Sequence, residues 1–107
     1  MRTIGFRDTS FGLTATGTTQ ATALELIAQY NEVTTTASGT GVVLNDELAY
    51  GDEQTVYNGG ANPLTVYPPS AMKINSLSTN AGMLLGVKTT CRFSWASETR
   101  IIGTLSA

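Results

Sequence analysis

Short runs of strand-forming residues, each ended by glycine, asparagine, proline or serine, recur about every 8–12 residues along the chain. Threonine is the commonest residue, and the 107 residues include 18 Thr, 8 Ser and 11 Gly. Threonine favours strands, whereas glycine and serine favour turns. This pattern excludes a helical bundle or a coiled coil. It predicts an all-β fold, a single small antiparallel β-sandwich or barrel.

The strands can be placed from these runs. We expect strands at Asn31–Thr36, Val42–Leu44, Glu53–Asn58, Pro63–Tyr67, Lys73–Asn75, Met83–Val87, Thr89–Trp95 and Arg100–Leu105. The strongest turn signal is the stretch Asn58–Asn62, where Gly59 or Gly60 is expected to take the positive φ of a hairpin turn. A final hairpin is expected across Ala96–Thr99.

The segment Thr19–Glu32 has two interpretations. Ala23, Leu24 and Ile27 approximate helical spacing, which allows a short helix. Leu24 and Leu26 also alternate with a polar residue between them, as in a strand. We favour a strand to about Ile27, then a bend, then the strand from Asn31.

The first residues differ in character from the rest. Residues 1–12 mix apolar, charged and glycine residues without clean alternation, so we interpret them as an extended N-terminal arm, with an edge strand as the alternative. Residues 13–107 form the single β domain. The residues of the arm expected to contact a capsid or another subunit are Arg2, Ile4, Phe6, Arg7 and Phe11.

The charge pattern restricts the partners. The net charge is −2 and the six basic residues are scattered, which argues against nucleic acid as a partner. No apolar run reaches the length of a membrane helix, and the N-terminus lacks the apolar region of a signal peptide. A single cysteine, Cys91, forms no internal disulfide, which suits a protein assembled inside the cell.

The sequence offers little catalytic chemistry. It contains no histidine, which removes the commonest general base and most zinc sites. Cys91 shares strand parity with Phe93 and Trp95, so we expect it to point into the core. We therefore predict that the chain is not an enzyme and carries no cofactor or metal.

Two alternatives to that prediction rest on particular residues. The carboxylates of Asp46, Glu47, Asp52 and Glu53 flank one loop, where they suit Ca²⁺ or an acid–base pair if the loop is tight. The calcium-loop spacing is absent, so we favour solvated charges. Tyr50, Tyr57, Tyr67 and Trp95 are typical of sheet packing, with a sugar-stacking platform as the alternative.

Two stretches carry a resemblance to a known family. TGTTQATALELIAQYNEVTTTASGTGVVL and TVYNGGANPLTVYPPSAMKINSLSTNAGMLL contain, in order, N-x-V-T-T, S-G-T-G-V-x-L, V-x-N-x-G-A-N-x-L-x-V-Y-P and I-N-x-L. In this order and spacing they resemble a recurrent module of tailed-phage proteins, and the departure from that module is the ending, where Trp95 is followed by ASETRIIGTLSA. The resemblance covers about residues 17–95 and leaves the arm outside.

The resemblance implies a function. In that family the module belongs to virion structural proteins, such as head decoration proteins and fibre-like appendages, usually as trimers. It implies a capsid decoration (cement) protein, assembled in the host cytoplasm, that binds the major capsid protein as a homotrimer. The alternative is a tail-fibre, spike or neck appendage that contacts a host glycan or another virion protein.

Overall fold

The computed structural model describes residues 8–106, which form ten strands and no helix. The strands are β1 (Thr9–Thr14), β2 (Leu24–Glu25), β3 (Tyr30–Thr35), β4 (Gly41–Val43), β5 (Glu53–Asn58), β6 (Leu64–Tyr67), β7 (Lys73–Ile74), β8 (Met83–Leu85), β9 (Thr89–Trp95) and β10 (Arg100–Leu105). Between residues 8 and 106 there is accordingly no helix that could cross a membrane.

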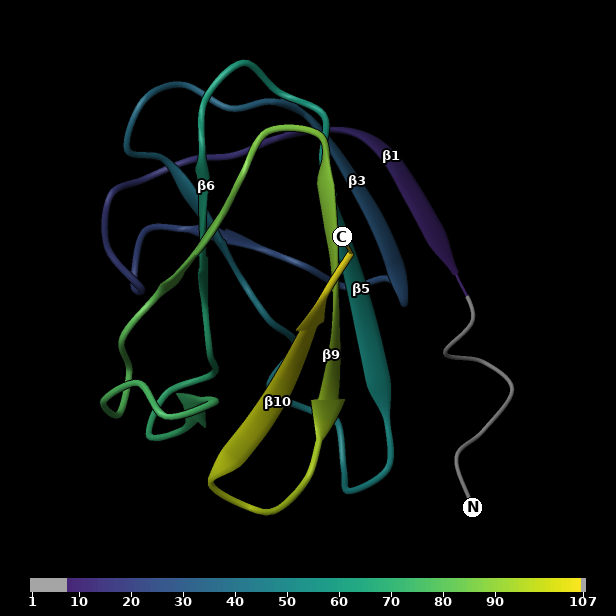
Figure 1. The fold of residues 1–107 in the computed structure, drawn as a ribbon, viewed down its shortest axis with the longest axis vertical. Coiled ribbons are helices and arrows are strands. Elements are labelled where there is room, and N and C mark those ends of the chain that lie inside the picture. Colours follow the sequence, from purple (N-terminus) through teal and green to yellow (C-terminus); the bar gives the residue numbers. More distant parts are fainter. Residues whose placement is uncertain (1–7, 107) are drawn as a thin grey trace.

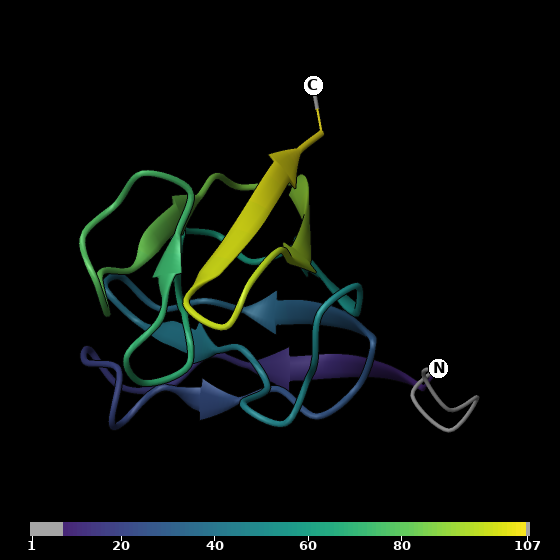
Figure 2. The same cartoon turned by 90° about the horizontal axis from the view of Figure 1, so that it is seen from below.

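The chain winds as a β-solenoid of stacked coils. Strands β1, β3 and β5 lie side by side in parallel in one sheet, and β2, β4 and β6 do so in the other. Thr9 lies opposite Tyr30 and Tyr30 opposite Thr55, while Leu24 lies opposite Val42 and Val42 opposite Val66. One turn of the coil therefore takes 18 to 25 residues. Figure 2 shows the chain advancing along the stack from purple to yellow.

The predicted β-sandwich or barrel is therefore wrong, although the all-β class is right. A sandwich needs antiparallel neighbours joined by hairpins, whereas β5 and β6 lie in different sheets and pair with strands of the preceding coil. Residues 58–63 form a corner between the sheets instead of the predicted hairpin turn (Figure 1). Neither Gly59 nor Gly60 has a positive φ.

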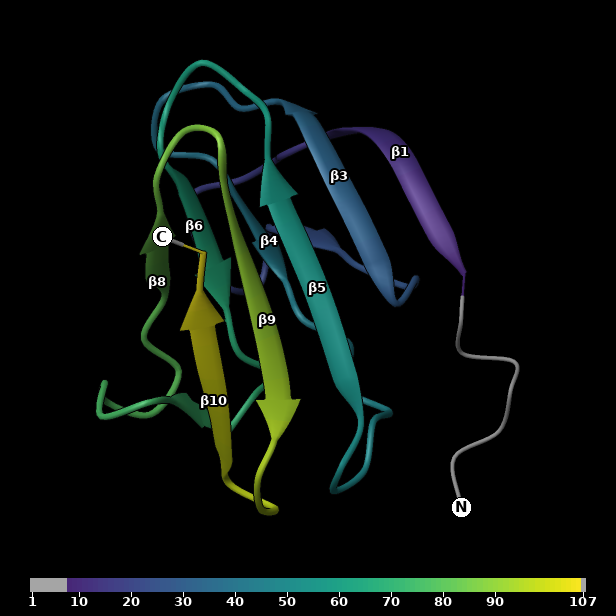
Figure 3. The same ribbon diagram turned by 45° about the vertical axis from the view of Figure 1, so that its right-hand side comes forward.

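Antiparallel strands cover the last coil. Strand β9 pairs antiparallel with β5, and β8 pairs antiparallel with β6. The predicted final hairpin is confirmed, because β10 pairs antiparallel with β9 (Figure 3). Strand β7 completes the larger sheet in the order β1-β3-β5-β9-β10-β7.

The core lies between the two sheets, where alternate residues of each strand point inward. On β9, Cys91, Phe93 and Trp95 are buried, which confirms the predicted parity. The fully buried members of the core include Val33, Val56, Phe93 and Ile101 from the larger sheet and Val42, Leu64, Val66 and Leu85 from the smaller one.

The segment Thr19–Glu32 contains no helix. After a turn in which Thr22 N and Ala23 N both donate to Thr19 O, Leu24–Glu25 form the short strand β2, and β3 begins at Tyr30. The side chain of Leu26 is 1% exposed and that of Ile27 is 71% exposed. The alternating burial of the strand interpretation therefore holds here, and the helical spacing of Leu24 and Ile27 is coincidental.

Candidate functional site

Of the five residues predicted to contact a partner, only one lies in the described part of the chain. Phe11 is on β1, its side chain is 68% exposed, and its ring meets the edge of Tyr30 with centroids 6.4 Å apart. The other four residues lie outside the described residues: Arg2, Ile4, Phe6 and Arg7.

A bulge in β1 turns Phe11 away from the core. The register against β3 shifts between Ser10 and Leu13, and Gly12 between them has a φ of 67°. Leu13 packs against the core. Within residues 8–106, β1 has β3 as its one neighbour, so its other edge is unpaired. Because β1 carries no charge and no proline, only the bulge protects this edge from pairing with another chain.

The exposed aromatic surface that begins at Phe11 continues onto the outer face of the larger sheet. Tyr30 and Tyr57 are partly exposed there on adjacent strands, and Glu32 lies opposite Tyr57. Burial, with smaller contributions from the charges of Glu32 and Tyr57, raises the pKa of Tyr30 above its ordinary value. The side chains of Phe11, Tyr30 and Tyr57 place aromatic surface on this face, which suits contact with another protein better than catalysis.

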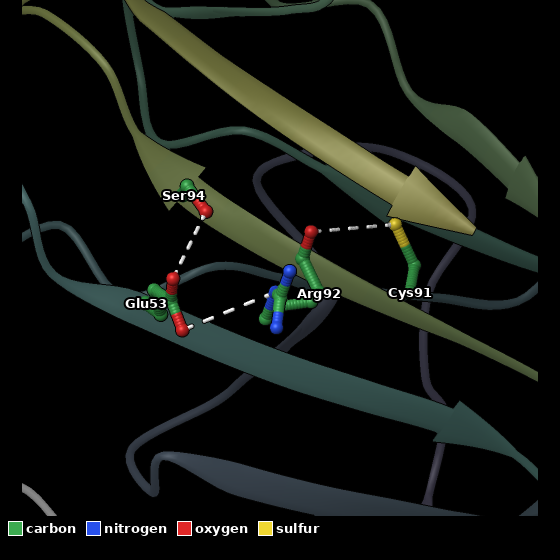
Figure 4. Close-up of polar contacts among 4 residues, drawn as sticks. All are labelled: Glu53, Cys91, Arg92 and Ser94. Carbon is green, nitrogen blue, oxygen red and sulfur yellow. Dashed lines mark hydrogen bonds and ion pairs between the residues drawn. The ribbon is translucent and has the colours of Figure 1, made fainter. Parts of the chain in front are cut away.

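Glu53, Arg92 and Ser94 form a polar group on the same outer face (Figure 4). Arg92 Nε lies 4.0 Å from Glu53 Oε1, and Ser94 Oγ donates to Glu53 Oε2 over 3.4 Å. The side chains of Arg92 and Glu53 are 59% and 44% exposed. These long, solvated contacts are a cross-strand pair of ordinary strength and offer no activated nucleophile.

The four carboxylates that flank the loop, Asp46, Glu47, Asp52 and Glu53, do not come together in one site. Asp52 accepts a hydrogen bond from Ala49 N and so closes its own loop, while Glu53 faces Arg92 on the other side of the strand. In the described part of the chain, no three acidic, cysteine or histidine side chains are placed to hold a metal. The alternative of one aromatic platform built from Tyr50, Tyr57, Tyr67 and Trp95 also does not hold. Tyr57 is on the outer sheet face and Tyr67 donates its hydroxyl to Thr18 O.

Three adjoining cavities form a groove along one side of the coil, and Asp46 lines all of them. The two larger ones have volumes of about 330 and 410 Å³. Tyr50 and Trp95 line the first, where a hydrogen bond to Glu98 raises the pKa of Tyr50. We call this the acidic groove, because the residues of its walls between positions 8 and 106 include the carboxylates Glu25, Asp46, Glu47 and Glu98 and no lysine or arginine.

Sequence reasoning missed this groove because its walls come from distant segments. The loop after β4, the loop after β6 and the turn between β9 and β10 meet only once the chain has coiled. A list of acidic residues along the chain gives no sign of that meeting.

Cys91 is a core residue, as predicted. Its side chain is buried, and burial raises the pKa of the thiol to about 11. Its Sγ lies 4.0 Å from Arg92 O (Figure 4). A thiol with this pKa is protonated at neutral pH and does not act as a nucleophile.

Comparison with known proteins finds no match to a protein-family model, to a curated protein or to a solved structure.

Proposed function

We propose that the chain is a non-enzymatic structural protein of a tailed-phage virion, a capsid decoration protein that binds the head lattice as a homotrimer. The observation that carries the proposal is the position of Phe11, exposed on a strand whose outer edge is unpaired and uncharged. Native proteins usually protect such an edge or pair it with another chain.

The residues that carry the phage resemblance form corners and strands of the coil, and this role in the body of the protein supports the proposal. The stretch 38–44 leads through the corner into β4, and the stretch 56–68 contains a corner and β6. These residues shape the body, and among residues 8–106 none of them pairs with the outer edge of β1. A stable body without activated groups is what a virion component requires.

The trimer is proposed from the resemblance and from the edge of β1 together. A contact between unlike surfaces of neighbouring copies closes into a ring when the rotation between them fits. A threefold ring covers the outer edge of β1 in every copy, and the Phe11 side chain on the sheet face remains to contact the lattice. Sedimentation equilibrium of the full-length protein tests this step, and a monomer at micromolar concentration would overturn it.

Binding to capsids tests the lattice contact. Wild-type protein is expected to sediment with expanded, undecorated capsids of the phage whose genome carries the chain. Phe11→Ser is expected to remain in the supernatant, because it removes the exposed ring from β1. The matched control is Leu84→Ser, which removes a side chain that is 67% exposed on β8, in the other sheet.

The outcomes separate the candidate functions. Wild-type protein that does not sediment with capsids overturns the decoration function, and equal binding by Phe11→Ser overturns the role of β1. Binding to a glycan array without binding to capsids would favour the appendage function instead.

A further inference from the structure

One asparagine of the chain is followed by glycine, and it lies at a buried corner of the coil. The six asparagines of the sequence include a single Asn-Gly pair, Asn58–Gly59. Asparagine amides are among the thermolabile groups of proteins. A following glycine has no side chain to keep its nitrogen from reaching the amide carbon. In an unfolded chain this pair is therefore the step most open to deamidation.

Deamidation at this pair needs a direct approach of two atoms. Gly59 N attacks Cγ of Asn58, and its proton passes to Nδ2, which leaves as ammonia when its bond to Cγ breaks. The resulting succinimide ring takes up water at either of its carbonyl carbons and opens to aspartate or isoaspartate. The reaction therefore requires an unbonded Gly59 nitrogen, an amide that can turn, and water.

The folded corner provides none of the three. Gly59 N donates a hydrogen bond of 2.7 Å to Val33 O on the preceding coil. The Asn58 amide makes four hydrogen bonds, all of which must break before it can turn toward Gly59. Asn58 is 0% exposed, so water does not reach its side chain.

The product of the reaction does not fit the corner. Nδ2 of Asn58 donates to two carbonyl oxygens, Asn62 O at 2.9 Å and Leu85 O at 3.0 Å. A carboxylate has no proton to donate, so at this position it would face both acceptors as an unpaired buried charge. Isoaspartate adds one carbon to the main chain and so disrupts the register that places Asn58 opposite Val33 and Thr89.

We propose that Asn58–Gly59 is a modification site that folding closes: the amide is lost to water only while the corner is open, and the deamidated chain no longer stacks. A chain that stays unfolded is then removed irreversibly from the pool that can fold, whereas a folded chain keeps its amide. This inference is independent of the proposed function, because it depends only on contacts within one coil stack.

Peptide mapping by mass spectrometry tests the protection in the full-length chain. Ser38→Asn creates a second Asn-Gly pair at an exposed turn, where Gly39 follows, and this pair is the matched control within the same molecule. In native protein at mildly alkaline pH, we expect position 58 to deamidate at least about a hundredfold more slowly than position 38, because its corner must first open. In urea that unfolds the chain, the two rates should be similar.

Equal rates at the two positions in native protein overturn the protection. A rate at position 58 that stays slow in urea overturns its cause, because the fold is then not what protects the amide. Thr36→Val removes the hydroxyl that donates to Oδ1 of Asn58, and it is expected to raise the native rate several-fold without changing the rate in urea. An unchanged native rate overturns the contribution of this bond between coils.

Refolding tests the fate of the product. Wild-type protein is held in urea until part of it is deamidated, and the urea is then diluted. Chains with aspartate or isoaspartate at position 58 are expected to be depleted from the folded fraction in size-exclusion chromatography and enriched in the remainder. Deamidated chains that refold with the urea stability of wild type overturn the proposal that the product cannot stack.

Discussion

Thr36 Oγ1 donates a hydrogen bond of 3.0 Å to Oδ1 of Asn58, and this bond joins the corners of two successive coils. The same oxygen accepts from Gly60 N, while Asn58 Nδ2 donates to Asn62 O and Leu85 O. Asn58 is fully buried. One amide therefore bonds to backbone groups of its own corner and of the strand that covers it, and to a side-chain hydroxyl of the coil before it.

Replacing Asn58 tests how much this amide stabilises the stack. Asn58→Ala leaves one hydroxyl, one N–H and two carbonyl groups without their partner in a buried position. Each unsatisfied buried group costs about 1–3 kcal/mol, so we expect the free energy of unfolding to fall by about 3 kcal/mol or more. Urea denaturation measures this change. Thr104→Ala, at an exposed position on β10, is the control and should stay within about 0.5 kcal/mol.

Gly60 is required at the same corner for a steric reason. A Cβ at Gly60 would lie 2.7 Å from both the Cβ and the backbone N of Thr36. At Gly59 it would lie 3.1 Å from Cε2 of Tyr57, a side chain that can move. We expect Gly60→Ala to lower the free energy of unfolding by about 2–3 kcal/mol and Gly59→Ala by less than about 1 kcal/mol.

Thermal unfolding of the two glycine variants decides this point. Equal melting temperatures for Gly59→Ala and Gly60→Ala would show that the corner can move away from Thr36. In that case the contact with the preceding coil is not what requires glycine at position 60.

The strands were predictable from the sequence, but their partners were not. The predicted bounds of β5, β9 and β10 agree with the structure, because turn residues mark both ends of each strand. The turn Asn58–Asn62 suits a hairpin and a coil corner equally well. What decides between them is whether β6 pairs with β5 or with β4, and that depends on contacts along the whole coil.

The buried amides and the acidic groove could not be predicted from the sequence for the same reason. Asn58 bonds to residues 22 and 27 positions away, and Gln54 Nε2 donates to Ala28 O, 26 positions away. No local pattern distinguishes these amides from solvated ones. Burial of Cys91, by contrast, followed from strand parity alone, because β9 is long and its alternation is regular.

The pair of Glu53 and Arg92 is expected to contribute little to stability. Its atoms are 4.0 Å apart and both side chains are about half exposed, so solvent screens the attraction. Glu53→Gln should change the free energy of unfolding by less than about 1 kcal/mol. Combined with Arg92→Gln in a double-mutant cycle, the coupling energy should be below about 0.5 kcal/mol. A coupling above 2 kcal/mol that persists in 1 M salt would contradict the solvated geometry.

Cys91 should make stability depend on pH in the alkaline range. Burial raises the pKa of its thiol from 9.0 to about 11. Below pH 9 the thiol is protonated in both the folded and the unfolded chain, so it adds no pH dependence. Above pH 9 the unfolded chain loses this proton while the folded chain still holds it, so ionisation favours unfolding. Between pH 9 and 11 the free energy of unfolding should therefore fall by up to about 1.4 kcal/mol per pH unit.

Comparison with Cys91→Ala isolates this contribution, because the tyrosines that titrate in the same range are present in both proteins. The variant is less stable at every pH owing to the cavity it leaves, and that difference should be constant from pH 6 to 8. From pH 9 to 11 the difference should shrink as wild type loses the stability associated with its protonated thiol. A difference that stays constant to pH 11 would mean that the thiol ionises as readily in the folded chain as in the unfolded one. Burial of Cys91 between the two sheets would then not protect its proton.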